Sequence, residues 1–221
     1  MRLKNLLTVG VMISQVGYFT PALYSQSLLN VDFGIGTSSA KVGYAAVGKS
    51  DNDFWNLYSR DDGNGGYRDF GTVSNLKWAD GTVSSVGLTV ANAPGAWLNG
   101  LDDPMYNVYL YPFNSDNITV TVTDLPPGRY DLYLYGHGGP GIDSLNAVFE
   151  VQTGRNNYGT QATTTGSEWT SPVWEEGNQY VVFRGVGISG SDRSATIISH
   201  PGAYGLAVIN GMQVVRQNGS N

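Results

Sequence analysis

The sequence contains no cysteine and few basic residues. Without cysteine, its 221 residues can form no disulfide framework, thiol nucleophile or thiolate metal site. Twelve Lys and Arg residues against 18 Asp and Glu residues give a formal net charge of −6, and no basic cluster follows the first few residues. Nucleic-acid binding requires a surface that neutralises phosphates. We therefore expect no nucleic-acid partner.

Long apolar runs are also missing, except at the N-terminus. Residues 1–5 carry two positive charges, residues 6–19 are mostly apolar, and residues 21–25 include small residues. This order is typical of a secretory signal peptide, which we place at residues 1–26; an uncleaved membrane anchor is the alternative. We expect a protein that is secreted or held at the cell surface, with no membrane span in its mature chain.

The composition favours strands over helices. Charged residues make up 14% of the chain, whereas glycine occurs 30 times and tyrosine 14 times, which suits short strands joined by turns. No shift in composition marks a boundary between domains. We therefore predict one all-β domain over residues 27–221.

The clearest strand signal lies at residues 118–135. Ile118, Val120 and Val122 alternate with threonines, and a second alternating segment follows the turn at residues 124–128, which predicts a β-hairpin. Residues 97–103 are expected to form a loop, and Gly211 suggests a bulge or a tight join between strands. The whole pattern predicts an antiparallel β-sandwich of jelly-roll topology. Further strands are predicted at residues 28–33, 42–47, 83–90, 106–111, 147–151, 158–165, 180–183, 195–199 and 206–215.

Four motifs in this order carry a resemblance to a known group of proteins. They are Asn30–Gly34, Phe54–Asn56, Leu125–Gly136 and Ala207–Val215. Together they resemble exported bacterial β-sandwich proteins of the galactose-binding-domain-like superfold, some of which carry a C-terminal sorting anchor. The resemblance implies carbohydrate binding, although it supplies no set of ligand residues and supports fold more than function.

Aromatic residues beside short polar groups are the strongest functional signal. A sugar presents apolar C–H faces to flat rings and hydroxyls to amides and carboxylates. The alternative is that these rings cap the core of the sandwich. Tyr109, Tyr111, Tyr133 and Tyr135 would form a platform if their strands were neighbours, and convergence of the tryptophans on one concave patch would favour binding. The candidate ligand-binding residues are Trp55, Trp97, Asn99, Asp102, Tyr109, Tyr133, Tyr135, His137, Trp169 and Trp174.

The segment His137–Gly141 is similar to a catalytic motif, but its surroundings in the sequence do not support catalysis. It looks like the His-Gly-Gly oxyanion segment of α/β-hydrolases, but no G-x-S-x-G motif and no flanking helices occur. We interpret it as a glycine-rich loop at the edge of the sandwich. His137 could bond a ligand there with Asp143 and Asn146.

Acidic residues offer two further possibilities. The pairs Asp102–Asp103, Glu175–Glu176, Asp61–Asp62 and Asp51/Asp53 could contain the two carboxylates of a glycosidase, whose spacing in space decides the mechanism; solvated turns are the alternative. A structural calcium ion could be held by backbone carbonyls with Asp32 or Asp51, while the loop at Asp61, Asp62 and Asn64 departs from the EF-hand pattern. No other cofactor is expected.

Three functions are compatible with these features. The first is a secreted, non-catalytic module that binds a poly- or oligosaccharide. The second is a structural or adhesive extracellular matrix protein that binds protein or itself, and the third is an enzyme acting on glycans.

Overall fold

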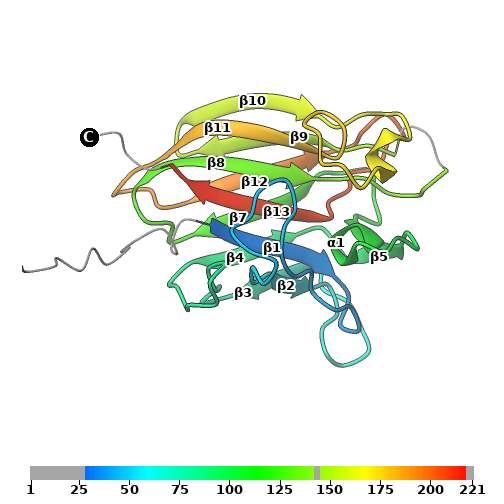
Figure 1. The fold of residues 1–221 in the computed structure, drawn as a ribbon, viewed down its shortest axis with the longest axis horizontal. Coiled ribbons are helices and arrows are strands. Elements are labelled where there is room, and N and C mark those ends of the chain that lie inside the picture. Colours follow the sequence, from blue (N-terminus) through cyan, green and yellow to red (C-terminus); the bar gives the residue numbers. More distant parts are fainter. Residues whose placement is uncertain (1–27, 142–144, 218–221) are drawn as a thin grey trace, which may run out of the picture.

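The computed structural model describes residues 28–141 and 145–217 and contains two stacked β-sheets (Figure 1). The predicted signal peptide lies outside these residues. The predicted all-β antiparallel sandwich is confirmed. The five-stranded sheet has the order β11 (Tyr180–Ile188), β8 (Gly128–Tyr135), β13 (Gly211–Arg216), β1 (Leu28–Gly34) and β2 (Asn56–Ser59).

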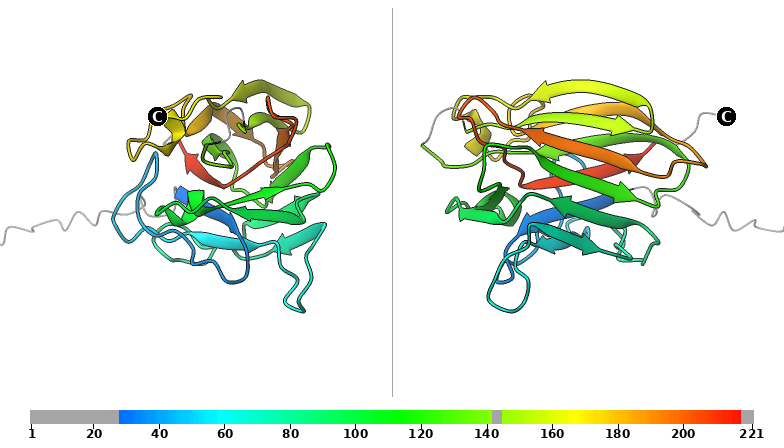
Figure 2. Two further views of the ribbon diagram at one scale, coloured as in Figure 1. Left: turned by 90° about the vertical axis from the view of Figure 1, so that its right-hand side faces the viewer. Right: turned by 180° about the vertical axis from the view of Figure 1, so that it is seen from behind.

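The second sheet has six strands and is seen from behind in the right-hand view of Figure 2. All its strand pairs are antiparallel, whereas β1 and β2 in the first sheet are parallel. The chain changes sheet between β2 and β3, β7 and β8, β8 and β9, β10 and β11, β11 and β12, and β12 and β13, as in a jelly roll. The order is β10 (Asn156–Ala162), β9 (Val148–Thr153), β12 (Ala195–His200), β7 (Ile118–Thr123), β4 (Gly87–Ala91) and β3 (Phe70–Val73).

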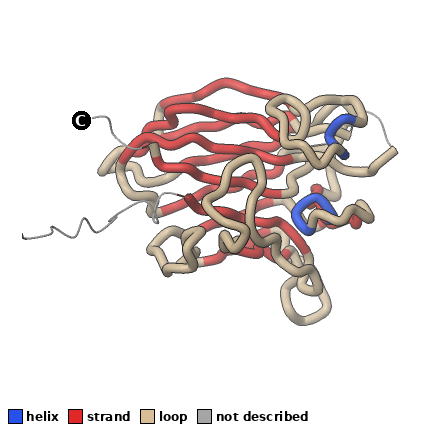
Figure 3. The backbone as a smooth tube through the Cα atoms, viewed as in Figure 1, coloured by secondary structure: helices blue, strands red, loops and turns tan. Residues whose placement is uncertain are grey.

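Helical structure is slight, as Figure 3 shows. The helix α1 (Pro104–Asn107) is a single turn and is followed directly by β6 (Val108–Tyr111). β6 pairs with β5 (Gly95–Leu98), and the two strands form a separate two-stranded sheet. A 3-10 turn lies at Glu168–Thr170. Within residues 28–141 and 145–217, no helix has the length and apolar character needed to span a membrane.

Alternating side chains build the core between the sheets. Ile118, Val120 and Val122 of β7 are buried while the intervening threonines are half-buried. Leu132 and Leu134 of β8 face them from the other sheet within the same apolar cluster. β-branched residues suit such strands because they pack well on a pleated surface.

The predicted hairpin at residues 118–135 is wrong. β7 pairs with β4 and β12, whereas β8 pairs with β11 and β13 in the opposite sheet. Residues 124–127 therefore cross the sandwich, with Leu125 fully buried between the sheets. Arg193 Nε and Nη2 donate to the carbonyl oxygens of Leu125 and Asp124 at 3.1 and 2.8 Å. Alternation identifies the buried face of a strand, but not its neighbours.

Other local predictions also need correction. Residues 42–47 form a loop with one isolated bridge, from Val42 to Phe54, rather than a strand. Residues 97–103 begin within β5, and residues 106–107 belong to α1 rather than to a strand. Gly211 is packed closely against both α1 and a strand, since an added Cβ atom would clash with Met105 Sδ of α1 and lie 3.1 Å from the Val31 carbonyl oxygen of β1.

Candidate functional site

Loops cover the outer face of the five-stranded sheet, so this face is not exposed to solvent. Residues 35–55 cross in front of β1 and β13 (Figure 1), and residues 165–179 and α1 close the same face at one end. These segments create a second apolar cluster, separate from the core between the sheets. Its buried members are Ala45, Trp55, Met105, Tyr106, Tyr135 and Trp169.

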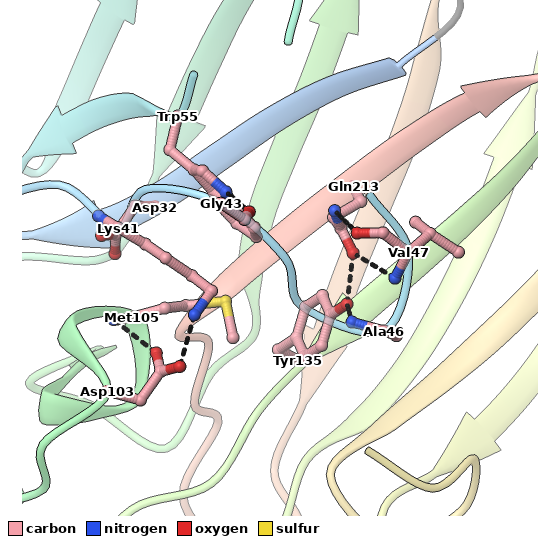
Figure 4. A network of polar contacts seen from close by, with 10 residues as sticks. All are labelled: Asp32, Lys41, Gly43, Ala46, Val47, Trp55, Asp103, Met105, Tyr135 and Gln213. Atoms are coloured by element: carbon pink, nitrogen blue, oxygen red, sulfur yellow. Dashed lines mark hydrogen bonds and ion pairs between the residues drawn. The ribbon is translucent and has the colours of Figure 1, made fainter. Parts of the chain in front are cut away.

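Buried hydrogen bonds fix the 35–55 loop to the sheet (Figure 4). Gln213 of β13 accepts hydrogen bonds from the Val47 amide at 3.2 Å and from the Tyr135 hydroxyl at 2.5 Å. Its own amide donates to Asn30 Oδ1 and to the Val47 carbonyl. The Tyr135 oxygen in turn accepts the Ala46 amide. Because an unpaired buried polar group is costly, this network holds the loop in one position.

The loop carries a lysine to the end of the sheet. Lys41, whose side chain is 8% exposed, forms an ion pair with Asp103, the N-cap residue of α1. Its Nζ also lies 5.6 Å from the centroid of the Trp174 ring. The Lys41 amide donates to Asp32 Oδ2 at 2.8 Å, and burial raises the pKa of Asp32 to about 7. Asp32 and Asp103 thus both bond to Lys41, which lies beside the Trp174 ring.

An aromatic pocket of about 380 Å³ opens beside this ion pair. We call it the tryptophan pocket. Tyr106 stacks on Trp174 with ring centroids 5.7 Å apart and also contacts Trp169 at 5.6 Å. The pocket therefore combines flat apolar walls with carboxylates and hydroxyls. Its lining residues are Leu101, Asp102, Asp103, Tyr106, Trp169, Thr170, Ser171, Pro172 and Trp174.

Two buried residues, His137 and Gln179, support the walls of the pocket. The His137 ring stacks on Trp169, with centroids 4.8 Å apart and an interplanar angle of 1°. Its Nε2 donates to the Asn178 carbonyl at 2.7 Å, and burial lowers the pKa of His137 to about 4, so the ring is neutral at pH 7. The Gln179 amide donates to the Ser171 and Val173 carbonyls, and the Tyr106 hydroxyl donates to the Gln179 carbonyl.

The structure brings together some of the residues predicted from the sequence. Asp102, Trp169 and Trp174 line the tryptophan pocket, and Trp169 is mostly buried there. Trp97 lies apart on β5 and is 61% exposed. Asn99 is engaged within the protein, since it donates to the Tyr106 carbonyl and accepts the Gly139 amide.

Besides Trp169, four predicted residues are buried, and none of these four lines the tryptophan pocket. Trp55 is 2% exposed and donates to the Gly43 carbonyl, and Tyr135 belongs to the network below the 35–55 loop. Tyr109 and His137 are likewise buried. We assign these four a structural role: long-range packing covers positions that the local sequence suggests are open.

The predicted tyrosine platform does not form. Tyr109 and Tyr111 lie on β6, which pairs with β5, whereas Tyr133 and Tyr135 lie on β8, which pairs with β11 and β13. Tyr133 is half-buried and contacts Tyr180 instead, with ring centroids 5.7 Å apart. The condition for the platform, that the two strands be neighbours, is not met.

The glycine-rich loop and the remaining acids have local partners. Asn146 donates to the Thr163 carbonyl and accepts the Ala203 amide, while Asp143 lies outside the described residues. Glu176 forms an ion pair with Arg184, and Asp62 accepts the Asn64 and Gly66 amides. Among the residues that the structure describes, no group of three His, Asp or Glu side chains is placed to hold a metal. The calcium site stays a prediction.

Sequence reasoning missed Lys41, Tyr106 and Gln179. None of the three carries a motif of its own. Tyr106 lines the pocket from α1, Lys41 lies over the Trp174 ring, and Gln179 donates to the Ser171 and Val173 carbonyls. The only local signal was Asp103–Pro104, an N-cap residue before a proline, which marks the start of a helix.

Comparison with known proteins gives little additional information. No family model matches the sequence. No curated protein matches it either. A solved structure described as TmCBM61 in complex with β-1,4-galactotriose aligns with a TM-score of 0.30 and 12% identity, covering 70% of this chain and 88% of that one. A similarity this low assigns neither a family nor a ligand to this chain.

Proposed function

We propose that this protein is a non-catalytic carbohydrate-binding module that takes up an oligosaccharide or polysaccharide in the tryptophan pocket. The observation that carries the proposal is the pocket itself. Trp174 offers apolar ring surface, with the buried rings of Tyr106 and Trp169 packed behind it, and Asp102, Thr170 and Ser171 place polar groups at the edge of the pocket. Sugars match this combination because they are apolar on their ring faces and polar at their rims.

The electrostatics favour a neutral ligand. Lys41 already occupies the cationic position beside Trp174 and is paired with Asp103. Asp102 is exposed, and within residues 28–141 and 145–217 its carboxylate has no hydrogen-bond partner. A carboxylate of this kind accepts hydrogen bonds from sugar hydroxyls without needing a charged ligand.

Binding is favoured over glycoside hydrolysis by the state of the acids. A general acid needs a raised pKa and must touch its substrate. Asp32 has the raised pKa but is 1% exposed. Asp103 lines the pocket, but its two oxygens accept from the Met105 amide and pair with Lys41. The proposal includes secretion, which is supported only by the N-terminal sequence pattern.

A binding experiment with matched variants tests the proposal. The wild-type protein is screened on a glycan array, and positive sugars are titrated by calorimetry. We expect Trp174→Ala to weaken binding about tenfold or more, equivalent to about 1.4 kcal/mol, and Asp102→Asn to weaken it without disturbing the fold. Phe70→Ala, an exposed aromatic on β3 of the other sheet, is the control and should bind normally. Absence of binding to every glycan would refute the proposal.

A further inference from the structure

Two more pockets adjoin the tryptophan pocket and extend it around α1. The middle pocket, of about 360 Å³, shares Leu101 and Asp102 with the tryptophan pocket. The outer pocket, also about 360 Å³, shares Ile35, Leu98 and Val108 with the middle one. The three hollows thus follow one another from Trp174 at one end to the outer pocket at the other. Each has the size of a small-molecule site.

The chemistry along this line alternates between aromatic and polar. Trp97, 61% exposed, lines the outer pocket, and the middle pocket is lined by the hydroxyls of Thr37, Ser38 and Ser39. Arg60 is the one basic residue among the described residues that line the three pockets, and it is already bonded to the Pro94 carbonyl. An elongated ligand that is neutral and rich in hydroxyls fits this lining better than an anion does.

Trp97 is held on a fixed support. Its strand, β5, pairs with β6 in the register Trp97 to Tyr109. β6 is joined to the segment before β13 by two backbone hydrogen bonds between Leu110 and Ile209, of 2.9 and 3.2 Å. Arg60 Nη1 fastens the start of β5 through the Pro94 carbonyl at 2.8 Å. A ring placed in advance on regular structure loses little entropy when a ligand binds.

We propose that the three pockets form one continuous cleft that binds an internal stretch of a neutral polysaccharide chain. Trp174 contacts one end of the bound stretch, the hydroxyl-lined middle pocket holds its centre, and Trp97 contacts the far end. The inference rests on the proposed function, because it extends the same site. It implies that binding strengthens with chain length until the cleft is filled, since each added sugar unit gains contacts.

A length series measures this directly. Wild-type protein is titrated by calorimetry with β-1,4-linked gluco-, galacto-, manno- and xylo-oligosaccharides, from disaccharides to hexasaccharides. For the type of sugar that binds, we expect the affinity to rise with length. Trp97→Ala should weaken binding of the longest chain about tenfold while leaving the disaccharide unchanged, and Trp97→Phe should restore part of the loss. Trp174→Ala should weaken binding at every length.

The results separate this inference from the proposed function. If affinity is equal at all lengths and Trp97→Ala behaves as wild type, the cleft is wrong and the tryptophan pocket alone binds sugar. An equal loss at all lengths in Trp97→Ala, or a change only in self-association, also overturns the cleft. If wild type binds none of these sugars and none on the array, both proposals fail. Circular dichroism of each variant checks that exposed Trp97 is dispensable for folding.

Discussion

Asp32 and His137 are two buried side chains whose altered pKa values fall between pH 4 and 7. Burial raises the pKa of Asp32 from 3.8 to about 7, with the carboxylate of Asp103 adding to the shift and Lys41 opposing it. Burial lowers the pKa of His137 from 6.5 to about 4. Both groups therefore prefer their neutral forms in the folded protein. Their effects on stability run in opposite directions with pH.

These shifts predict opposing slopes of stability against pH. The folded state holds the Asp32 proton more tightly than the unfolded chain, so this contribution falls as pH rises from about 4 to about 7. The folded state binds the His137 proton less tightly, so that contribution is present above pH 6.5 and is lost as pH falls towards 4. Each slope is at most about 1.4 kcal/mol per pH unit. In wild type the two largely cancel between pH 4 and 6.5.

Single variants should separate the two slopes in urea unfolding measured across this pH range. In Asp32→Asn, which retains an oxygen for the Lys41 amide, the free energy of unfolding should rise with pH relative to wild type. In His137→Gln, which retains a donor for the Asn178 carbonyl, it should fall. Parallel profiles for the two variants and wild type would contradict both assignments.

The same residue scale shows why the candidate site was only partly predictable. Period-2 alternation correctly placed Tyr133 and Tyr135 on the same side of β8, away from the core between the sheets. It could not show that the 35–55 loop lies on Tyr135 and hides it. Trp55 and Trp174 both sit next to acids or amides in sequence, yet Trp55 is buried and Trp174 borders a pocket. Burial of a loop side chain depends on distant residues.

At the scale of elements, strand positions were easier to predict than strand partners. β1, β7, β8, β9 and β12 coincide closely with predicted segments because their alternation is strong. β5 was assigned to a loop because Gly95, Asn99 and Gly100 flank its short apolar run. The crossing at residues 124–127 resembles a hairpin turn because proline and glycine favour both kinds of turn. Only the register of the paired strands distinguishes them.

The one-turn helix α1 depends on Asp103, which acts both as its N-cap and as the ion-pair partner of Lys41. We expect Asp103→Ala to lower the free energy of unfolding by about 1–3 kcal/mol, since it removes the cap and leaves the largely buried lysine unpaired. Asp103→Asn retains a capping oxygen and should lose less. Chemical denaturation measures both.

The ligand affinity of these variants supplies the functional control. Both should weaken sugar binding, because Asp103 lines the tryptophan pocket and positions Lys41 over Trp174. Asp116→Asn, an exposed aspartate on the loop before β7, should change neither property. Equal stability of Asp103→Ala and wild type would show that α1 forms without its cap.

For the whole molecule, the two apolar clusters share one sheet. β8 contributes Leu132 and Leu134 to the core between the sheets and Tyr135 to the cluster under the loops. We therefore predict that the described part of the chain unfolds in one cooperative transition, in agreement with the single domain expected from composition. Thermal unfolding followed by far-UV circular dichroism should coincide with that followed by near-UV signals, to which Trp169 and Trp174 contribute. A separate, earlier near-UV transition would mean that the loop layer melts independently.

The central position of β13 has a consequence for the order of folding. β13, the last strand in the sequence, lies between β8 and β1, the first strand, and bonds to both. Until residues 211–216 emerge from the ribosome, β1 and β8 have no common neighbour, and the polar groups of Gln213 are not yet available to Asn30, Val47 and Tyr135. The sheet and its loop layer can therefore be completed only after synthesis of β13. Closing such long-range pairs is slow, so we expect completion of this sheet to be a late step in folding.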